Sequence, residues 1–271
     1  MSLVEHDGVS ESSAVGAFAD RRVRVTFVLL LCAVLVPAIA LGAGTSNSGD
    51  LLSHRTVRLG RSVDGRSIMA VETGDFDSPR KALVVGCIHG NECAGVAVAD
   101  RLAQSAPPRE VDLWVVPNLN PDGRAAGTRQ NAHGVDLNRN FPRAWRRMVG
   151  LYDSGQRPLS EPESRIAVRL IERVRPSVSI WFHQHRDVVD DSSGSIAIER
   201  TFATVAKMRL EALVREPGSA VTWQSHCLPH STAFVVELAA GALGADAVAR
   251  LGDAVLAAAA ASPERRVVAR C

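Results

Sequence analysis

The pattern of apolar and polar positions divides the chain into short buried strands that alternate with helices. Apolar runs too short for a helix cover residues 82–88, 111–117, 178–183 and 233–238, as is typical of strands buried on both faces of a sheet. Runs with helical spacing cover residues 92–103, 160–174, 203–214 and 245–261. This alternation predicts an α/β fold with a mixed, mostly parallel central sheet and helices on both faces.

The folded domain is expected to start near Ser53. Residues 59–74, LGRSVDGRSIMAVETG, predict a hairpin whose strands meet at the turn Val63-Asp64-Gly65-Arg66. With 271 residues and 46% hydrophobic content, the chain can bury one large core. We therefore expect a single folded domain over residues 53–271.

The residues before this domain have a different pattern. Residues 1–24 are polar and end in a cluster of arginines, residues 25–43 are almost wholly apolar, and residues 44–52 form a polar linker. Basic residues before an apolar core, followed by small residues at A-x-A spacing, predict an export signal. The apolar run is also long enough to span a bilayer as an uncleaved anchor. We expect the domain to be exported, to the cell wall or to the outer face of the cytoplasmic membrane, with membrane association through residues 25–43 as the alternative to cleavage.

Charge and cysteine content exclude two classes of function. The net charge is +2, with 31 basic and 29 acidic residues scattered along the chain, so the electrostatic footprint of a nucleic-acid-binding protein is missing. The five cysteines contain no CxxC pair, which disfavours a structural zinc ribbon, and their spacing implies no disulfide framework. The pairing of Cys87, Cys93, Cys227 and Cys271 stays open, and so does the oligomeric state.

A pair of residues that can bind a metal follows the first apolar run. His89 and Glu92 lie three residues apart where the chain must turn, and Gly90 between them permits a tight backbone. An imidazole nitrogen and a carboxylate can converge on one divalent ion, and a catalytic zinc needs a third protein ligand beside an open position for water. The alternative is that His89 merely ends a strand and Glu92 is an acidic residue in the first turn of the next helix.

Two later strands also carry polar groups at their ends. His183 ends the run 178–183, and Glu237 lies within the run 233–238. Glutamate is rarely buried without a partner, and a general base beside a metal-bound water would explain Glu237. Ligands of α/β sheets gather at the carboxyl ends of the strands. The polar segment 118–143 is expected to be a long irregular loop that contributes to the same site.

The ordered set of motifs resembles the zinc carboxypeptidase family over about residues 59–241. The motifs are His89-Gly-Asn-Glu92, Asn120-Pro-Asp-Gly123, Gly134-Val-Asp-Leu-Asn-Arg-Asn-Phe141, His183 and Glu237. Within that family, GVDLNRNFP, HQ-x-x-x-VVD and FVVEL are similar to the bacterial murein peptide amidase subgroup, whose members cleave the bond between γ-D-glutamate and diaminopimelate. The resemblance implies a zinc-dependent metallopeptidase or amidase that hydrolyses an amide bond in a peptide or muropeptide substrate, with residues 53–271 as its catalytic domain.

The resemblance also implies which residues hold the metal and move the proton. His89, Glu92 and His183 would bind one Zn²⁺, and Glu237 would act as the base and later as the acid. Zinc lowers the pKa of a bound water, and the cation together with a nearby arginine stabilises the oxyanion that forms. His185 is the alternative ligand to His183, or a partner of it, because both would share one face of a continuing strand.

The segment 118–143 would supply the groups that bind the substrate. Arg129 falls where the family places the arginine that polarises the scissile carbonyl, and Arg124 is the alternative for that role. Asn138 and Arg139 match the pair that grips a substrate carboxylate, a task suited to a planar, bidentate guanidinium.

Two departures from the digestive carboxypeptidases point to a different substrate pocket. Asn91 stands where those enzymes carry an arginine. They also close a tyrosine over the substrate from a loop shortly before the base, whereas the only tyrosine here, Tyr152, lies far upstream. His226 or His230 could cover that place, although each is more simply a loop histidine.

Two other functions remain as alternatives. A deacylase of the aspartoacylase type shares the HxxE motif, DLNR and a later histidine, but the intact NPDG, the FVVEL ending and the export signal disfavour it. A non-catalytic peptidoglycan-binding relative should have lost a metal ligand or the base, and neither is lost in this sequence.

Overall fold

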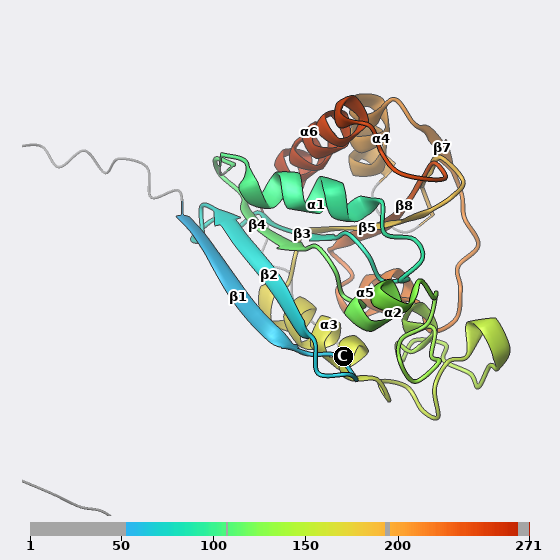
Figure 1. Ribbon diagram of the computed structural model, residues 1–271. Helices are drawn as coiled ribbons and strands as arrows, with labels where there is room; N and C mark the ends of the chain where they lie inside the picture. The colour runs from blue at the N-terminus through green and yellow to red at the C-terminus, as the bar shows by residue number, and fades with distance from the viewer. Residues whose placement is uncertain (1–52, 107, 193–195, 265–270) are drawn as a thin grey trace, which may run out of the picture. The chain divides into compact units, whose positions relative to one another are not determined.

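The computed structural model describes residues 53–106, 108–192, 196–264 and 271 (Figure 1). The segments expected as a basic leader, an export signal or anchor, and a linker, residues 1–24, 25–43 and 44–52, lie outside the described residues. The residues that are described belong to one unit of the chain, Ser48–Cys271. Within them, no helix is both long and apolar enough to cross a membrane.

An eight-stranded sheet forms the centre of the fold, with strand order β1-β2-β4-β3-β5-β8-β6-β7. The strands are β1 (Ser53–Arg61), β2 (Ser67–Gly74), β3 (Lys81–Val85), β4 (Asp112–Val116), β5 (Val178–Gln184), β6 (Val188–Asp190), β7 (Arg209–Glu211) and β8 (Thr232–Leu238). The pairs β3–β4, β3–β5, β5–β8 and β6–β7 are parallel, and β1–β2, β2–β4 and β6–β8 are antiparallel. The sheet is therefore mixed and mostly parallel, as the sequence predicted, and β1 and β2 form the predicted hairpin.

Helices cover both faces of this sheet (Figure 1). One face carries α1 (Gly95–Gln104), α4 (Ile196–Ala206) and α6 (Ala245–Ala261), and the other carries α3 (Pro162–Val174) and α5 (Ala220–Cys227). The connection between β4 and α3 contains α2 (Pro121–Ala126) and two 3₁₀ helices, Leu137–Arg139 and Gly150–Tyr152.

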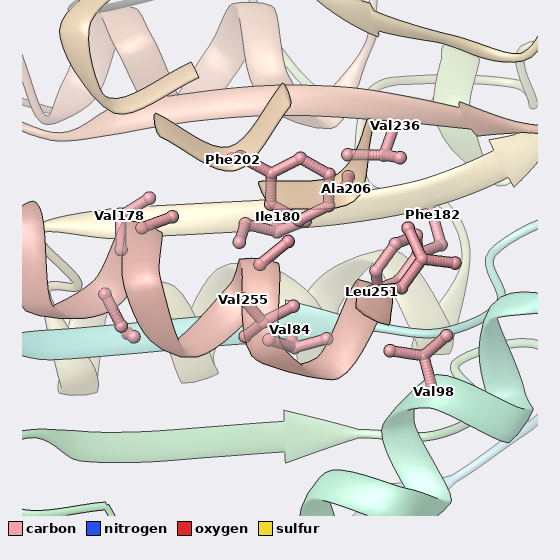
Figure 2. Packing of buried hydrophobic residues seen from close by; sticks show 14 of the residues in the cluster. Val84, Val98, Val178, Ile180, Phe182, Phe202, Ala206, Val236, Leu251 and Val255 are labelled. Carbon is pink, nitrogen blue, oxygen red and sulfur yellow. The ribbon is translucent and has the colours of Figure 1, made fainter. Parts of the chain in front are cut away.

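Side chains that alternate along the strands fill a core on each face. In β5, Ile180 and Phe182 point toward α4 and α6 (Figure 2), whereas Trp181 packs on the opposite side with α3 and α5. All of β4 is buried, and β5 is buried up to His183. Because both faces of these strands are covered, their sequences are continuous apolar runs rather than alternating ones.

The helix predicted from Glu92 begins three residues later, at Gly95. Glu92 therefore lies in the loop between β3 and α1, and the alternative that treated it as a first-turn helix residue is wrong. The helix predicted from residue 160 likewise begins at Pro162, where proline suits the first turn.

Two other segments differ from the prediction. The segment 118–143 is not wholly irregular, because Asn120 accepts a hydrogen bond from the Gly123 N–H and caps α2. The helix predicted over residues 203–214 ends at Ala206, and the following residues form β7, which pairs with β6. Pairing with a neighbouring strand overrides the local helical spacing there.

Two disulfides join four of the five cysteines, Cys87 with Cys93 and Cys227 with Cys271. The sequence spacing had implied no such framework. The second bridge spans 44 residues from the end of α5, and only the tertiary fold brings its partners together.

Candidate metal centre and active site

The carboxyl ends of three adjacent parallel strands, β3, β5 and β8, meet at one edge of the sheet. His183 and Glu237 are register partners in β5 and β8, each one residue from the end of its strand. Trp181 packs on the face covered by α3 and α5, so His183, two residues further on, points to that same face. His89 follows β3 in the loop that leads to α1.

His89, Glu92 and His183 bring three potential ligand atoms together. Nδ1 of His89 lies 3.1 Å from Nδ1 of His183. Oε2 of Glu92 lies 2.9 Å from the first nitrogen and 3.2 Å from the second. Both histidines are buried, with exposed fractions of 1% and 4%. Two imidazole nitrogens and one carboxylate oxygen that face a single point form a donor set suited to a catalytic zinc with one open position.

Asp136 connects this cluster to Arg129. Its Oδ1 lies 3.0 Å from Nε2 of His89, and its Oδ2 accepts a hydrogen bond from Nε of Arg129 at 2.8 Å. A carboxylate on the far nitrogen of a histidine fixes the ring and its tautomer, which leaves the near nitrogen, here Nδ1, for a metal. In the sequence, Asp136 is marked only by its place in the motif GVDLNRNFP. Its contact with His89, 47 residues away, was not visible in the sequence.

The charges of this network set its protonation states. Burial alone would raise the pKa of Asp136, but His89 and Arg129 hold that pKa well below its usual range. Burial likewise opposes ionisation of Glu92, yet its hydrogen bonds to His183 and His89 hold its pKa far below normal. Burial lowers the pKa of His183 to about 4. At neutral pH His183 is therefore a neutral imidazole, the form that can bind a metal.

Glu237 lies beside the cluster as a carboxylate without a partner. Its Oε2 is buried and makes no hydrogen bond within the described part of the chain. Burial and the charge of Glu92 raise the pKa of Glu237, while His89 and Arg186 oppose the shift. A half-buried carboxylate with a raised pKa, beside a cluster of potential metal ligands, is suited to accept and release a proton.

All the residues predicted for the site line one cleft of about 270 Å³. They are His89, Glu92, Arg129, Asn138, Arg139, His183 and Glu237. Two of the alternatives do not line it: Arg124 lies exposed in α2, and His185 is exposed beyond the end of β5. The strand does not continue to His185, so it does not share the face of His183.

Three polar side chains from the connection between β4 and α3 form one wall of the cleft. Arg129 donates from Nη1 to Oε1 of Glu92 at 2.6 Å. The buried guanidinium of Arg139 lies 3.4 Å from Glu216, and its Nε has no hydrogen-bond partner among the described residues. Asn138 accepts the backbone N–H of Ala220 through Oδ1, which leaves its amide nitrogen as an available donor.

Tyr152 packs against both arginines of this wall. The guanidinium carbon of Arg129 lies 5.3 Å from the centre of the ring, and that of Arg139 lies 5.4 Å away, within the range of cation–π contacts. From its position in the sequence, far upstream of the base, Tyr152 was not expected near the site. His226 and His230, the alternatives for that place, are exposed and do not line the cleft.

Comparisons with known proteins agree with this geometry. The family model described as zinc carboxypeptidase matches residues 52–193. The chain belongs to the zinc carboxypeptidase family. This carboxypeptidase-family chain is 30% identical over 188 residues to murein peptide amidase A of Escherichia coli K12, which covers 60% of the chain and 77% of that relative.

The fold of this chain is also similar to those of solved structures from the same family. The crystal structure of the murein-tripeptide amidase of Escherichia coli O157 matches with a TM-score of 0.63 and 26% identity, over 77% of this chain and 92% of that one. Carboxypeptidase A of Helicoverpa armigera matches with a TM-score of 0.63 at 18% identity, over 77% of this chain and 69% of that one, and shows the shared fold. The predicted fold class and the predicted family are thus confirmed, and this zinc carboxypeptidase family member is a hydrolase of the metallocarboxypeptidase type.

Proposed function

We propose that this enzyme is a zinc-dependent amidase that hydrolyses an amide bond in peptidoglycan-derived peptides, such as the bond between γ-D-glutamate and diaminopimelate. The main observation in support is the convergence of His89, Glu92 and His183 beside Glu237, whose Oε2 makes no hydrogen bond within the described residues. The similarity to murein peptide amidase A favours a muropeptide as the substrate. An N-acyl amino acid deacylase and a non-catalytic peptidoglycan-binding protein remain the competing functions.

We assign the metal to the three converging side chains. His89 and His183 would bind it through Nδ1, and Glu92 would bind it through its carboxylate. A zinc ion bound there would polarise the scissile carbonyl and lower the pKa of a water molecule.

The protein's own groups complete the reaction. Glu237, which lines the cleft, takes a proton from the attacking water and later gives it to the leaving nitrogen. Arg129 is held by Asp136 through Nε and by Glu92 through Nη1, and its Nη2 makes no hydrogen bond within the described residues. That nitrogen is available to the carbonyl oxygen as negative charge develops on it.

Asn138 and Arg139 supply the donors that bind a substrate carboxylate. Both residues line the cleft, and the amide nitrogen of Asn138 makes no hydrogen bond within the described part of the chain. The ring of Tyr152 lies within cation–π distance of the guanidinium groups of both Arg129 and Arg139. We infer that this tyrosine positions both arginines.

Asp136→Asn should weaken zinc binding by about 10–100-fold, the usual cost of losing a group that supports a metal ligand. The amide cannot supply the negative charge that now faces Nε2 of His89. Competition with a chromophoric zinc chelator measures the change. Asp122→Asn is the matched control, because Asp122 is also buried and hydrogen-bonded but lies with Ser62, outside the cleft. Equal affinity in Asp136→Asn and the control would contradict the supporting role of Asp136.

A panel of muropeptides, with products identified by mass, tests the proposed reaction. We expect the zinc-loaded protein to release a fragment that begins with diaminopimelate. A substrate whose terminal carboxylate is amidated should be cut more slowly, because Asn138 and Arg139 lose their partner. Cleavage of N-acyl amino acids alone would favour the deacylase, and binding without cleavage would favour the non-catalytic relative.

We also propose that the domain acts outside the cytoplasmic membrane. The basic segment and the apolar run 25–43 have the pattern of an export signal or anchor. The two disulfides support an oxidising compartment, since such bonds are rare in the cytosol. Fractionation of cells that express the full chain checks this, and recovery of the reduced protein in the cytosol would contradict it.

A further inference from the structure

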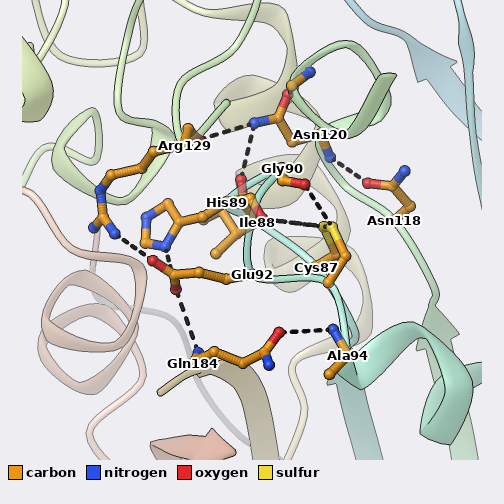
Figure 3. The surroundings of a disulfide bond; sticks show 12 residues. Cys87, Ile88, His89, Gly90, Glu92, Ala94, Asn118, Asn120, Arg129 and Gln184 are labelled. Carbon is orange, nitrogen blue, oxygen red and sulfur yellow. Dashed lines mark hydrogen bonds and ion pairs between the residues drawn. A yellow bond between two sulfur atoms is a disulfide. The ribbon is translucent and has the colours of Figure 1, made fainter. Parts of the chain in front are cut away.

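One of the disulfides closes a small ring around two of the candidate metal ligands. The segment 87–93 reads CIHGNEC, and Cys87 is bonded to Cys93 across a separation of six residues. His89 and Glu92 both lie inside this ring (Figure 3). The other disulfide, Cys227–Cys271, encloses none of the residues assigned to the metal.

The loop that carries Glu92 has little regular structure to hold it. Glu92 lies after the end of β3 and before the first residue of α1, Gly95. The backbone before His89 is fixed by neighbours: Leu119 N–H donates to the carbonyl of Cys87 at 2.8 Å, and Asn120 donates to the carbonyl of Ile88 at 3.1 Å. The backbone after Glu92 is held by the hydrogen bond from Ala94 N–H to the side chain of Gln184 at 3.0 Å and by the disulfide.

The backbone of the ring is also closely packed. The sulfur atoms of Cys87 and Cys93 lie 3.3 and 3.4 Å from the carbonyl oxygen of His89, so the bridge packs against the backbone that carries this ligand. At Gly90, within the ring, an added Cβ would lie 1.9 Å from the carbonyl carbon of Gly123. The loop therefore has no room to move outward, and the disulfide limits how far its two ends can separate.

We propose that the Cys87–Cys93 disulfide is a positioning element of the metal site. It holds His89 and Glu92 in the metal-binding arrangement before the metal arrives, so that less conformational freedom is lost on binding. Opening the bridge weakens the affinity for zinc. This inference rests on the metal site proposed above, but not on the identity of the substrate.

The bridge can be opened by a phosphine reductant. Cys93 is partly exposed whereas Cys87 is fully buried, so the phosphorus attacks the sulfur of Cys93 and the S–S bond breaks. Cys87 leaves as a thiolate and takes a proton from water. Water then cleaves the phosphorus–sulfur bond, which yields the thiol of Cys93 and the phosphine oxide. Overall, two electrons pass from phosphorus to the disulfide.

The first test compares two matched double variants by zinc competition with a chromophoric chelator. Cys87→Ala/Cys93→Ala should bind zinc about 10–100-fold more weakly than the wild type, the range found when support of a metal ligand is lost. Cys227→Ala/Cys271→Ala should bind zinc as the wild type does. Equal affinity in all three proteins would overturn the inference.

The second test needs no change within the ring. In the Cys227→Ala/Cys271→Ala background, phosphine treatment opens only the bond between Cys87 and Cys93. Zinc affinity should fall after removal of the phosphine and return after reoxidation, while the near-ultraviolet circular dichroism stays that of a folded protein. Unchanged affinity would overturn the positioning role, and so would a loss of affinity that is accompanied by loss of the folded spectrum. If the oxidised wild type binds no zinc, the proposed metal site itself fails, whatever the muropeptide assay gives.

Discussion

Replacing Glu237 with glutamine should lower the rate of amide hydrolysis by about 100-fold or more while zinc stays bound. Glutamine has nearly the same shape as glutamate, but its amide cannot accept a proton from the attacking water. Glu237 is not one of the three converging ligands, and its Oε2 makes no hydrogen bond among the described residues. The substitution therefore removes the proton acceptor without removing a metal ligand.

Single-turnover rates on a muropeptide, together with the zinc content of the same sample, measure this effect. The matched control is Glu72→Gln, because Glu72 is also a carboxylate on a strand, is paired with Arg55, and does not line the cleft. The control should keep the wild-type rate. A near-normal rate in Glu237→Gln would rule out Glu237 as the general base.

The raised pKa of Glu237 predicts a second effect of the same substitution, on the pH dependence of the stability of the metal-free protein. A carboxyl group whose pKa is higher in the folded than in the unfolded state favours folding when protonated, and that advantage is lost as the pH rises through the folded pKa. Glutamine cannot ionise. The free energy of unfolding of Glu237→Gln should therefore increase relative to that of the wild type as the pH rises from acidic to neutral. Denaturation in the presence of a chelator measures this difference.

Hydrophobic periodicity predicted the parts of the site that lie on regular strands, whereas the parts on loops were predicted from their motifs and the family resemblance. His183 and Glu237 lie at the ends of apolar runs, and parallel neighbouring strands must bring such ends to one edge of the sheet. The core strands and the last helix, Ala245–Ala261, were recognisable because burial imposes its pattern directly on the sequence. The motif order then indicated the family, which the comparisons confirmed.

The parts that the sequence did not reveal depend on contacts between irregular segments. Tyr152 reaches Arg129 and Arg139 from a 3₁₀ helix, and no periodic pattern marks that approach. The role of Asp136 requires its distance to His89, and the bond between Cys87 and Cys93 requires the turn between β3 and α1. Each of these contacts is set by how loops pack together, which local propensity does not encode.

These irregular contacts suggest why a loop can carry two of the three ligands. The loop between β3 and α1 has neither a strand nor a helix to fix Glu92. A hydrogen bond from Arg129 holds the carboxylate of Glu92, and the disulfide restrains the backbone of the loop. His183 needs no such support, because it lies within a strand that is bonded on both sides by β3 and β8.

His183→Ala should therefore abolish zinc binding by removing a ligand whose position is fixed before the metal arrives. The remaining pair, His89 and Glu92, offers too few protein ligands for a catalytic zinc, so the loss of affinity should exceed the roughly 10–100-fold cost of losing only a supporting group. His185→Ala is the matched control, because His185 is exposed and lies outside the cleft. Metal content after dialysis measures both variants, with circular dichroism to check that the cavity left in β5 has not unfolded the domain. If His183→Ala retains zinc fully and His185→Ala loses it, the third ligand is His185 and not His183. The register pairing of His183 with Glu237 would then have no role in catalysis.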